Sequence, residues 1–99
     1  MKFTIEIEIP NNDAVISPEL LDSYKAFFEL RILRDIYRNG WIPNWKGDDD
    51  KYCIYLHKTN IVIGVCVYCE WFLSFQNQET AKRFLQDNRE LIYKAKDLI

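Results

Sequence analysis

The 99-residue sequence predicts an α+β fold in the order β-α-β-β-β-α, with an antiparallel-rich four-stranded sheet and two helices packed on one face. An alternating segment opens the chain at 2–9, helical periodicity covers 17–39 and 77–99, and β-type segments lie between them at about 51–58, 61–68 and 71–75. This length suffices for one hydrophobic core, so we expect residues 1–99 to form a single domain without a separate catalytic lobe.

The first predicted strand is amphipathic. Apolar residues at odd positions face one way and polar residues at even positions the other, a pattern typical of a strand with one face in water. The apolar set is Phe3, Ile5, Ile7 and Ile9, and the polar set is Lys2, Thr4, Glu6 and Glu8. Turn residues at 10–13 end this strand.

The first helix has signals at both of its ends. Ser17 can accept a hydrogen bond from the first turn, and Pro18 suits the first helical position. Asn39-Gly40 tolerates the left-handed conformation that ends helices, and Pro43 prevents the helix from resuming. We therefore expect a helix of about six turns.

This helix carries two apolar stripes, and one flat sheet cannot bury both. We expect the first stripe to lie on the sheet; it consists of Leu20, Leu21, Tyr24, Phe27, Phe28 and Ile32. The second stripe has a 3-4 spacing suited to another helix and consists of Ala26, Leu30, Leu33 and Tyr37. The last helix or a partner must cover the second stripe, so Leu30, Leu33 and Tyr37 are candidate self-association residues.

The central strands and the last helix follow the same logic. Residues 61–68 are apolar on both faces, which is typical of a central strand, and Gly64 indicates a bulge or a close backbone approach. Asn77 can cap the last helix, whose apolar positions keep to one face from Ala81 to Ile99.

Composition points to an intracellular, water-soluble protein. The chain opens without a basic segment and apolar core of the kind found in signal peptides, and the longest uncharged apolar run, 61–69, is about half a membrane span. Three cysteines without a secretory signal indicate free thiols in a reducing compartment. We expect a cytoplasmic location, no membrane partner and no cofactor.

Metal and catalytic sites are not favoured. Cys53, His57, Cys66 and Cys69 superficially resemble zinc ligands, but residues four apart in a strand lie about 13 Å from one another. The Asp48-Asp49-Asp50 run lacks the spacing of a calcium loop and is interpreted as a solvated loop. His57 is the only histidine and no glycine-rich phosphate loop occurs, so we expect no enzyme activity.

Two surfaces could recognise a partner. Arg31, Arg34 and Arg38 share one helical face and could contact nucleic acid, although a solvated face is the alternative and the net charge of −2 argues against non-specific coating. Trp41 and Trp45, in the segment Gly40-Trp41-Ile42-Pro43-Asn44-Trp45, could form a recognition ledge. We favour the alternative that both indoles close the core beneath the helix end.

Three segments resemble small uncharacterised proteins encoded by phages and mobile elements of gut Bacteroidetes. They are the segment from Asn39 to Trp45, a tyrosine-rich strand beginning Lys51-Tyr52, and the start of the last helix from Leu73 to Ala81. The resemblance implies an accessory intracellular role and carries over no catalytic residues. We therefore expect a small interaction module acting through protein contacts, with a homo-oligomer as one option and a nucleic-acid-binding accessory protein as the alternative.

Overall fold

The computed structural model describes residues 17–67 and 70–99 and has the order α1 (Pro18–Arg38), β1 (Lys51–His57), β2 (Asn60–Cys66), β3 (Ser74–Phe75) and α2 (Gln78–Lys94). Its three-stranded antiparallel sheet has the strand order β2-β1-β3. The α+β class is confirmed. The predicted four strands and β-α-β-β-β-α order are not matched, because the strand expected at 2–9 lies outside the described residues.

Helix α1 begins and ends where its local chemistry predicts. The Ser17 hydroxyl accepts a hydrogen bond of 3.2 Å from the Leu20 N–H. At the other end Asn39 takes the left-handed conformation (φ 48°), and its N–H donates to the carbonyls of Asp35 and Ile36. Gly40 follows with φ 90°, so the helix stops at two residues that adopt positive φ at little cost.

Strands β1 and β2 form a regular hairpin. Their pairing runs without a bulge from Lys51 opposite Cys66 to His57 opposite Asn60. Gly64 marks a close approach, because a Cβ atom there would lie 2.7 Å from Cε1 of the Tyr55 ring. The sequence left a bulge and a close approach open at this glycine, and the structure shows the second.

Strand β3 is shorter than the predicted 71–75. Two aromatic residues that precede β3 pack against other elements. The Trp71 ring lies 5.3 Å from the Tyr55 ring of β1, and the Phe72 ring stacks on Phe27 of α1 at 4.3 Å, with both distances taken between ring centroids. The backbone still follows β1 at this point, since the Ile54 N–H donates to the Leu73 carbonyl at 2.8 Å. Tertiary packing of these rings limits regular pairing to Ser74 and Phe75.

Helix α2 has the predicted cap and an unpredicted break. Asn77 Oδ1 accepts a 2.7 Å hydrogen bond from the Thr80 N–H. The helix is interrupted at Asn88 (φ −125°, ψ 23°), whose side-chain amide donates to the Phe84 carbonyl at 3.1 Å. The side chain thereby satisfies a carbonyl near the break, as Asn commonly does outside regular helix.

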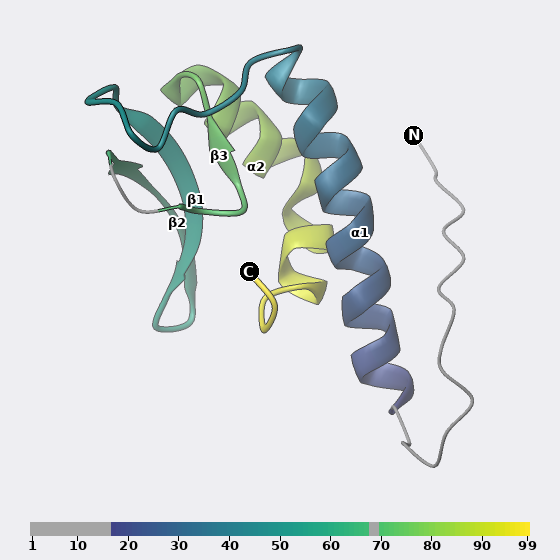
Figure 1. The fold of residues 1–99 in the computed structure, drawn as a ribbon. Coiled ribbons are helices and arrows are strands. Elements are labelled where there is room, and N and C mark those ends of the chain that lie inside the picture. The colour runs from purple at the N-terminus through teal and green to yellow at the C-terminus, as the bar shows by residue number, and fades with distance from the viewer. Residues whose placement is uncertain (1–16, 68–69) are drawn as a thin grey trace.

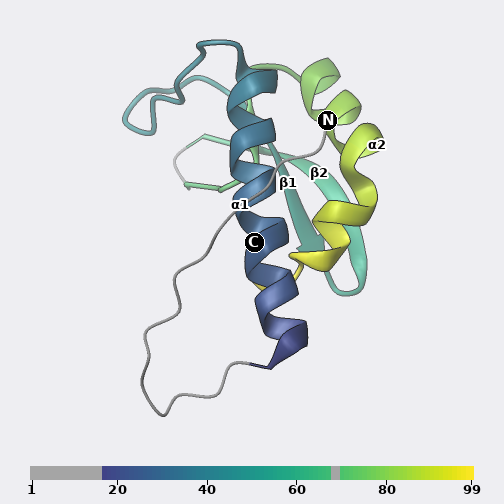
Figure 2. The same cartoon turned by 90° about the vertical axis from the view of Figure 1, so that its right-hand side faces the viewer.

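Both helices lie on the same side of the sheet (Figure 1), and Figure 2 shows them side by side in front of β1 and β2. Helix α1 contacts α2 and the edge strand β3, whereas α2 contacts all three strands. The core between these layers consists of Ala26, Leu30, Ile54, Leu73, Phe75, Ala81, Phe84, Leu85, Ile92 and Ala95.

The expected role of the first α1 stripe was wrong, whereas the second stripe is covered by the last helix, one of the two alternatives that the sequence left open. The second stripe enters the core, with Ala26 3% and Leu30 0% exposed, while most of the first stripe faces outward. The reason is the position of α1: its inner face meets α2 and β3 rather than the broad face of the sheet, and the small Ala26 side chain suits close helix contact. Phe27 is the first-stripe residue that packs on the core, through its stacking on Phe72.

Candidate interaction surface

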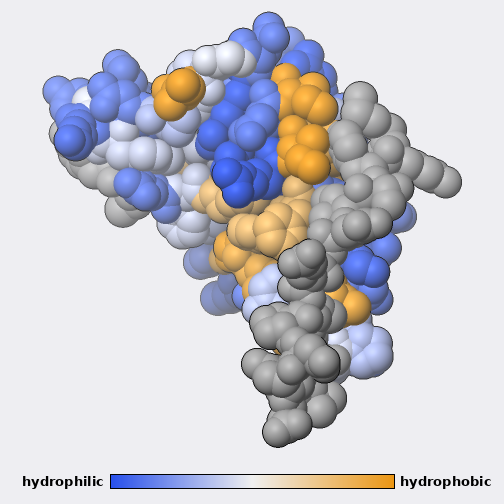
Figure 3. All heavy atoms as spheres, turned by 45° about the vertical axis from the view of Figure 1, so that its right-hand side comes forward, coloured by the Kyte–Doolittle hydropathy of each residue, from blue (hydrophilic) through white to orange (hydrophobic). Residues whose placement is uncertain are grey.

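Large apolar side chains occur at every fourth residue along the outward face of α1. We call Leu20, Tyr24, Phe28, Ile32 and Ile36 the outer stripe, and their exposed fractions lie between 37% and 48%. A space-filling view from the α1 side shows apolar side chains reaching the surface (Figure 3). Monomeric proteins rarely align so many large apolar residues in one exposed row, so the outer stripe is the candidate interaction surface.

The predicted self-association residues are used within the chain instead. Leu30 is fully buried, and Leu33 and Tyr37 pack against the core. The Tyr37 ring meets Phe84 of α2 edge-on at 4.9 Å between centroids, and its hydroxyl donates to Asp87 Oδ2 at 2.6 Å. Burial, reinforced by the Asp87 carboxylate, raises the pKa of the Tyr37 phenol above its ordinary value. Helix α2 therefore covers the second stripe.

Arg38 fastens the end of α1 to β3. Its side chain is 9% exposed and donates two hydrogen bonds to Ser74, from Nε to the carbonyl oxygen at 2.8 Å and from Nη2 to the hydroxyl at 2.6 Å. The guanidinium carbon lies 5.5 Å from the centroid of the Trp41 ring. Burial is the main cause that lowers the pKa of Arg38 to about 10, so the side chain remains charged at neutral pH.

The other two arginines divide between structure and solvent. Arg34 donates to the Phe72 carbonyl at 3.1 Å, lies over the Phe72 ring and pairs with Asp35 at 2.9 Å. Arg31 is exposed. Two of the three arginines predicted as a nucleic-acid face thus hold the chain segment that leads into β3.

Trp45 lies against a buried lysine. The Lys51 side chain is 0% exposed, its Nζ lies 5.2 Å from the Trp45 ring centroid, and it donates to the Val67 carbonyl at 2.8 Å. Trp41 and Trp45 are both half-buried, each against a buried cation. Ile42 between them is 83% exposed and supplies an apolar tip.

The predicted soft ligands do not come together as one metal site within the described residues. Cys53 is fully buried on β1, His57 at the far end of that strand is exposed, and Cys69 lies outside the described residues. Burial is the main cause that raises the pKa of the Cys53 thiol, and Cys66 of β2 adds to this shift. Within 17–67 and 70–99, no three His, Cys, Asp or Glu side chains converge to hold a metal ion.

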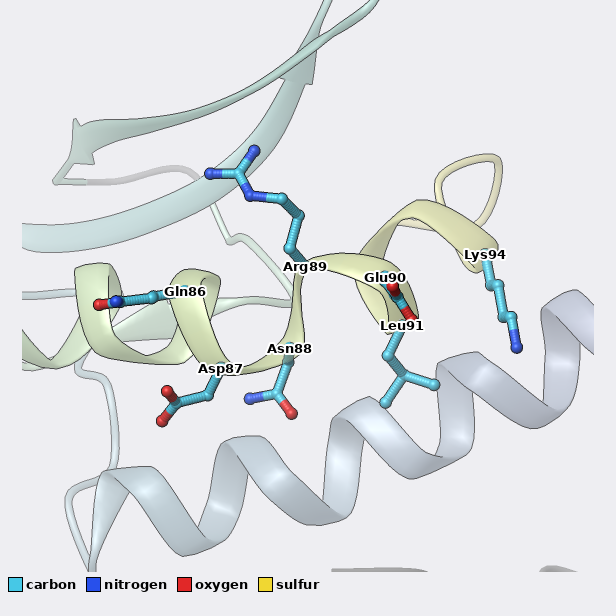
Figure 4. A pocket seen from close by; sticks show the side chains of 7 residues that line it. All are labelled: Gln86, Asp87, Asn88, Arg89, Glu90, Leu91 and Lys94. Atoms are coloured by element: carbon cyan, nitrogen blue, oxygen red, sulfur yellow. The ribbon is translucent and has the colours of Figure 1, made fainter.

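A cavity of about 530 Å³ lies at the break in α2. In Figure 4 the side chains of Asp87, Asn88 and Leu91 extend toward α1, whereas Arg89 extends toward the strands. Asp87 and Asn88 are already engaged, with the Tyr37 hydroxyl and the Phe84 carbonyl respectively. The polar side chains that line the cavity therefore do not converge on one point where a ligand would bind.

The outer stripe was not identified from the sequence as an exposed surface, although the spacing of its residues is visible there. Ile36 continues the row Leu20, Tyr24, Phe28 and Ile32 at strict four-residue spacing, and it was not included in the first stripe. The buried Lys51 and its carbonyl partner Val67 were also missed, since a lysine at a strand start gives no sign of burial.

Comparisons with protein-family models, curated proteins and solved structures found no match to this chain. The resemblance to phage and mobile-element proteins therefore stays a prediction. Neither of the two described helices has the length and apolar character needed to cross a membrane.

Proposed function

We propose that the protein is a small interaction module that pairs with a second copy of itself through the outer stripe of α1. The observation that carries this proposal is the row of large apolar side chains at positions 20, 24, 28, 32 and 36, each more than one third exposed. Burying such side chains supplies the main driving force of protein association, at roughly 25 cal/mol per Å² of apolar surface.

The spacing of the row favours a crossing helix as the partner. Each four-residue step advances about 40° around a helix, so the five positions sweep about 160° and cannot all face a parallel rod. Ridges of residues four apart instead pack into the matching grooves of a helix crossing at about −50°. Such a contact would centre on Phe28, with Tyr24 and Ile32 on either side.

Charge placement favours an identical partner. Lys25 and Glu29 border the outer stripe on the same side of Phe28. In an antiparallel twofold crossing centred on Phe28, Lys25 of one copy lies on the same rim as Glu29 of the other, and the converse pair forms by symmetry. Opposite charges at the rim of an interface help to set how the two partners align and speed their encounter, and they contribute less to the affinity.

Sedimentation over a concentration series tests the proposal. The wild-type chain is expected to shift from monomer to dimer as concentration rises, and Phe28→Glu to weaken the dimer at least about tenfold because it places a charge at the contact centre. Ile42→Glu is the matched control, since Ile42 is an 83% exposed apolar residue that belongs to neither the outer stripe nor the core. Wild-type protein that remains monomeric at millimolar concentration would contradict self-association.

Nucleic-acid binding is the weaker candidate. It was predicted from three arginines, and two of them donate to backbone carbonyls within the chain. An accessory role in a phage or mobile element likewise rests on the sequence resemblance alone.

A further inference from the structure

Strand β2 forms an edge of the sheet and lacks the usual protection of an edge strand. Within the described residues its only paired neighbour is β1. Its sequence, Asn60-Ile-Val-Ile-Gly-Val-Cys66, contains no charge and no proline, and its register with β1 has no bulge. Natural proteins block such edges with lysine, proline or bulges, or pair them with another strand. The features of β2 suit the second solution.

The space beside β2 on the helix side is hollow. A groove of about 510 Å³ runs between the start of β2 and α2, lined by Thr59, Asn60, Ile61, Val62, Arg89 and Tyr93. Val65, further along the strand, is 57% exposed, although Ile61 and Ile63 on the same face of β2 pack against the core. Apolar side chains from an added strand would fill this groove and cover Val65.

One segment of the chain has the pattern that this edge requires. Residues 2–9 lie outside the described part and alternate apolar and polar side chains over a length comparable to β2. They are joined to Ser17, at the start of α1, through residues 10–16, which can span up to about 24 Å. The start of α1 and the turn between β1 and β2 lie toward the same end of the molecule (Figures 1 and 2).

We infer that residues 2–9 of the same chain pair antiparallel with the free edge of β2 and complete a four-stranded sheet. Direct partners in an antiparallel pair share a face, and the apolar face of the segment must point toward the helices. This condition sets the register: Ile9 lies opposite Ile61, Ile7 opposite Ile63, and Ile5 opposite Val65. The polar residues between them then face away from the helices.

The outer stripe of α1 is a poorer place for this segment. A strand laid on a helix leaves both of its edges without backbone partners, and buried N–H and C=O groups require hydrogen bonds. The edge of β2 supplies those bonds along the whole segment. The two surfaces therefore take different occupants, the segment on β2 and a second helix on α1.

Nuclear Overhauser contacts in the full-length, isotope-labelled chain test the pairing directly. Contacts are expected between residues 5–9 and residues 61–65 in the stated antiparallel order. A mixture of labelled and unlabelled chains must show these contacts within one chain only. Contacts between chains, or contacts from residues 5–9 to Tyr24 and Phe28 of α1, would overturn the inference.

Amide hydrogen exchange gives a second readout that does not depend on observing those contacts. In Ile7→Asp, we expect hydrogen exchange to speed up by about tenfold or more at the β2 amides that point away from β1. The reason is that residues 2–9 detach from this edge while the rest of the fold persists. Glu6→Gln, on the polar face of the same segment, is the matched control and leaves exchange unchanged. Equal β2 exchange in Ile7→Asp and wild type would count against the pairing.

Discussion

Arg38 binds Ser74 through two hydrogen bonds, although the two residues lie 36 positions apart in the sequence. The guanidinium reaches both the backbone carbonyl and the hydroxyl of a serine that is itself 0% exposed. A planar fork of donors suits this paired recognition, and a lysine would act only as a point charge. The contact joins the end of α1 to β3 and so fixes the direction in which the outer stripe faces.

Replacing Arg38 by leucine is expected to lower the free energy of unfolding by about 2 kcal/mol or more, because both Ser74 groups lose their partner while buried. Urea unfolding followed by circular dichroism measures the loss. Arg31→Leu, an exposed position on the same helix, should change stability by less than about 0.5 kcal/mol. Equal losses in the two variants would show that the Arg38 contact contributes nothing specific.

Tyr37→Phe removes the hydroxyl that donates to Asp87 and is expected to cost about 1 kcal/mol at neutral pH. The raised pKa of Tyr37 also predicts an alkaline effect. Above pH of about 10 the unfolded phenol loses its proton while the folded one keeps it, so wild-type stability falls as pH rises through that range. Unfolding free energies measured from pH 7 to 11 should show a smaller alkaline fall in Tyr37→Phe. Identical slopes would contradict the assignment.

The buried thiol of Cys53 should cause a second loss of folding stability, which begins at a lower pH than the loss caused by Tyr37. An unfolded cysteine ionises near pH of about 8.5, whereas burial holds the folded thiol neutral to higher pH. Stability should therefore decline above that pH, by at most about 1.4 kcal/mol per pH unit for one group. Cys53→Ala lowers stability at pH 7 through lost packing but should show a shallower decline between pH 8 and 10. A decline parallel to wild type would mean that another group titrates there.

The helix ends were predictable because capping is local. Ser17 and Asn77 each act on backbone groups three residues away, so the relevant chemistry lies in adjacent sequence. The class of fold followed from the same periodicities. The start of β3 was not predictable, because Trp71 and Phe72 take ring partners from β1 and α1 that no alternation pattern encodes.

The candidate surface was found only in part for a related reason. Both α1 stripes have helical spacing, and burial of Leu30 in place of Phe28 depends on where α2 and β3 lie. The arginine run showed the same ambiguity. Its periodicity predicted one shared face, but the carbonyls that bind Arg34 and Arg38 come from a distant segment. Side-chain pattern identifies candidate surfaces, and tertiary structure decides which remain exposed.

Photo-crosslinking from position 28 tests the central claim most directly. A benzophenone amino acid replacing Phe28 retains an aromatic side chain at the expected centre of the contact between two α1 helices. In mixtures of light and heavy isotope-labelled chains, the account predicts crosslinked dimers whose mixed-isotope peptides join position 28 of one copy to residues 20–36 of the other. Crosslinks confined to single chains, including any to residues 2–9, would contradict it.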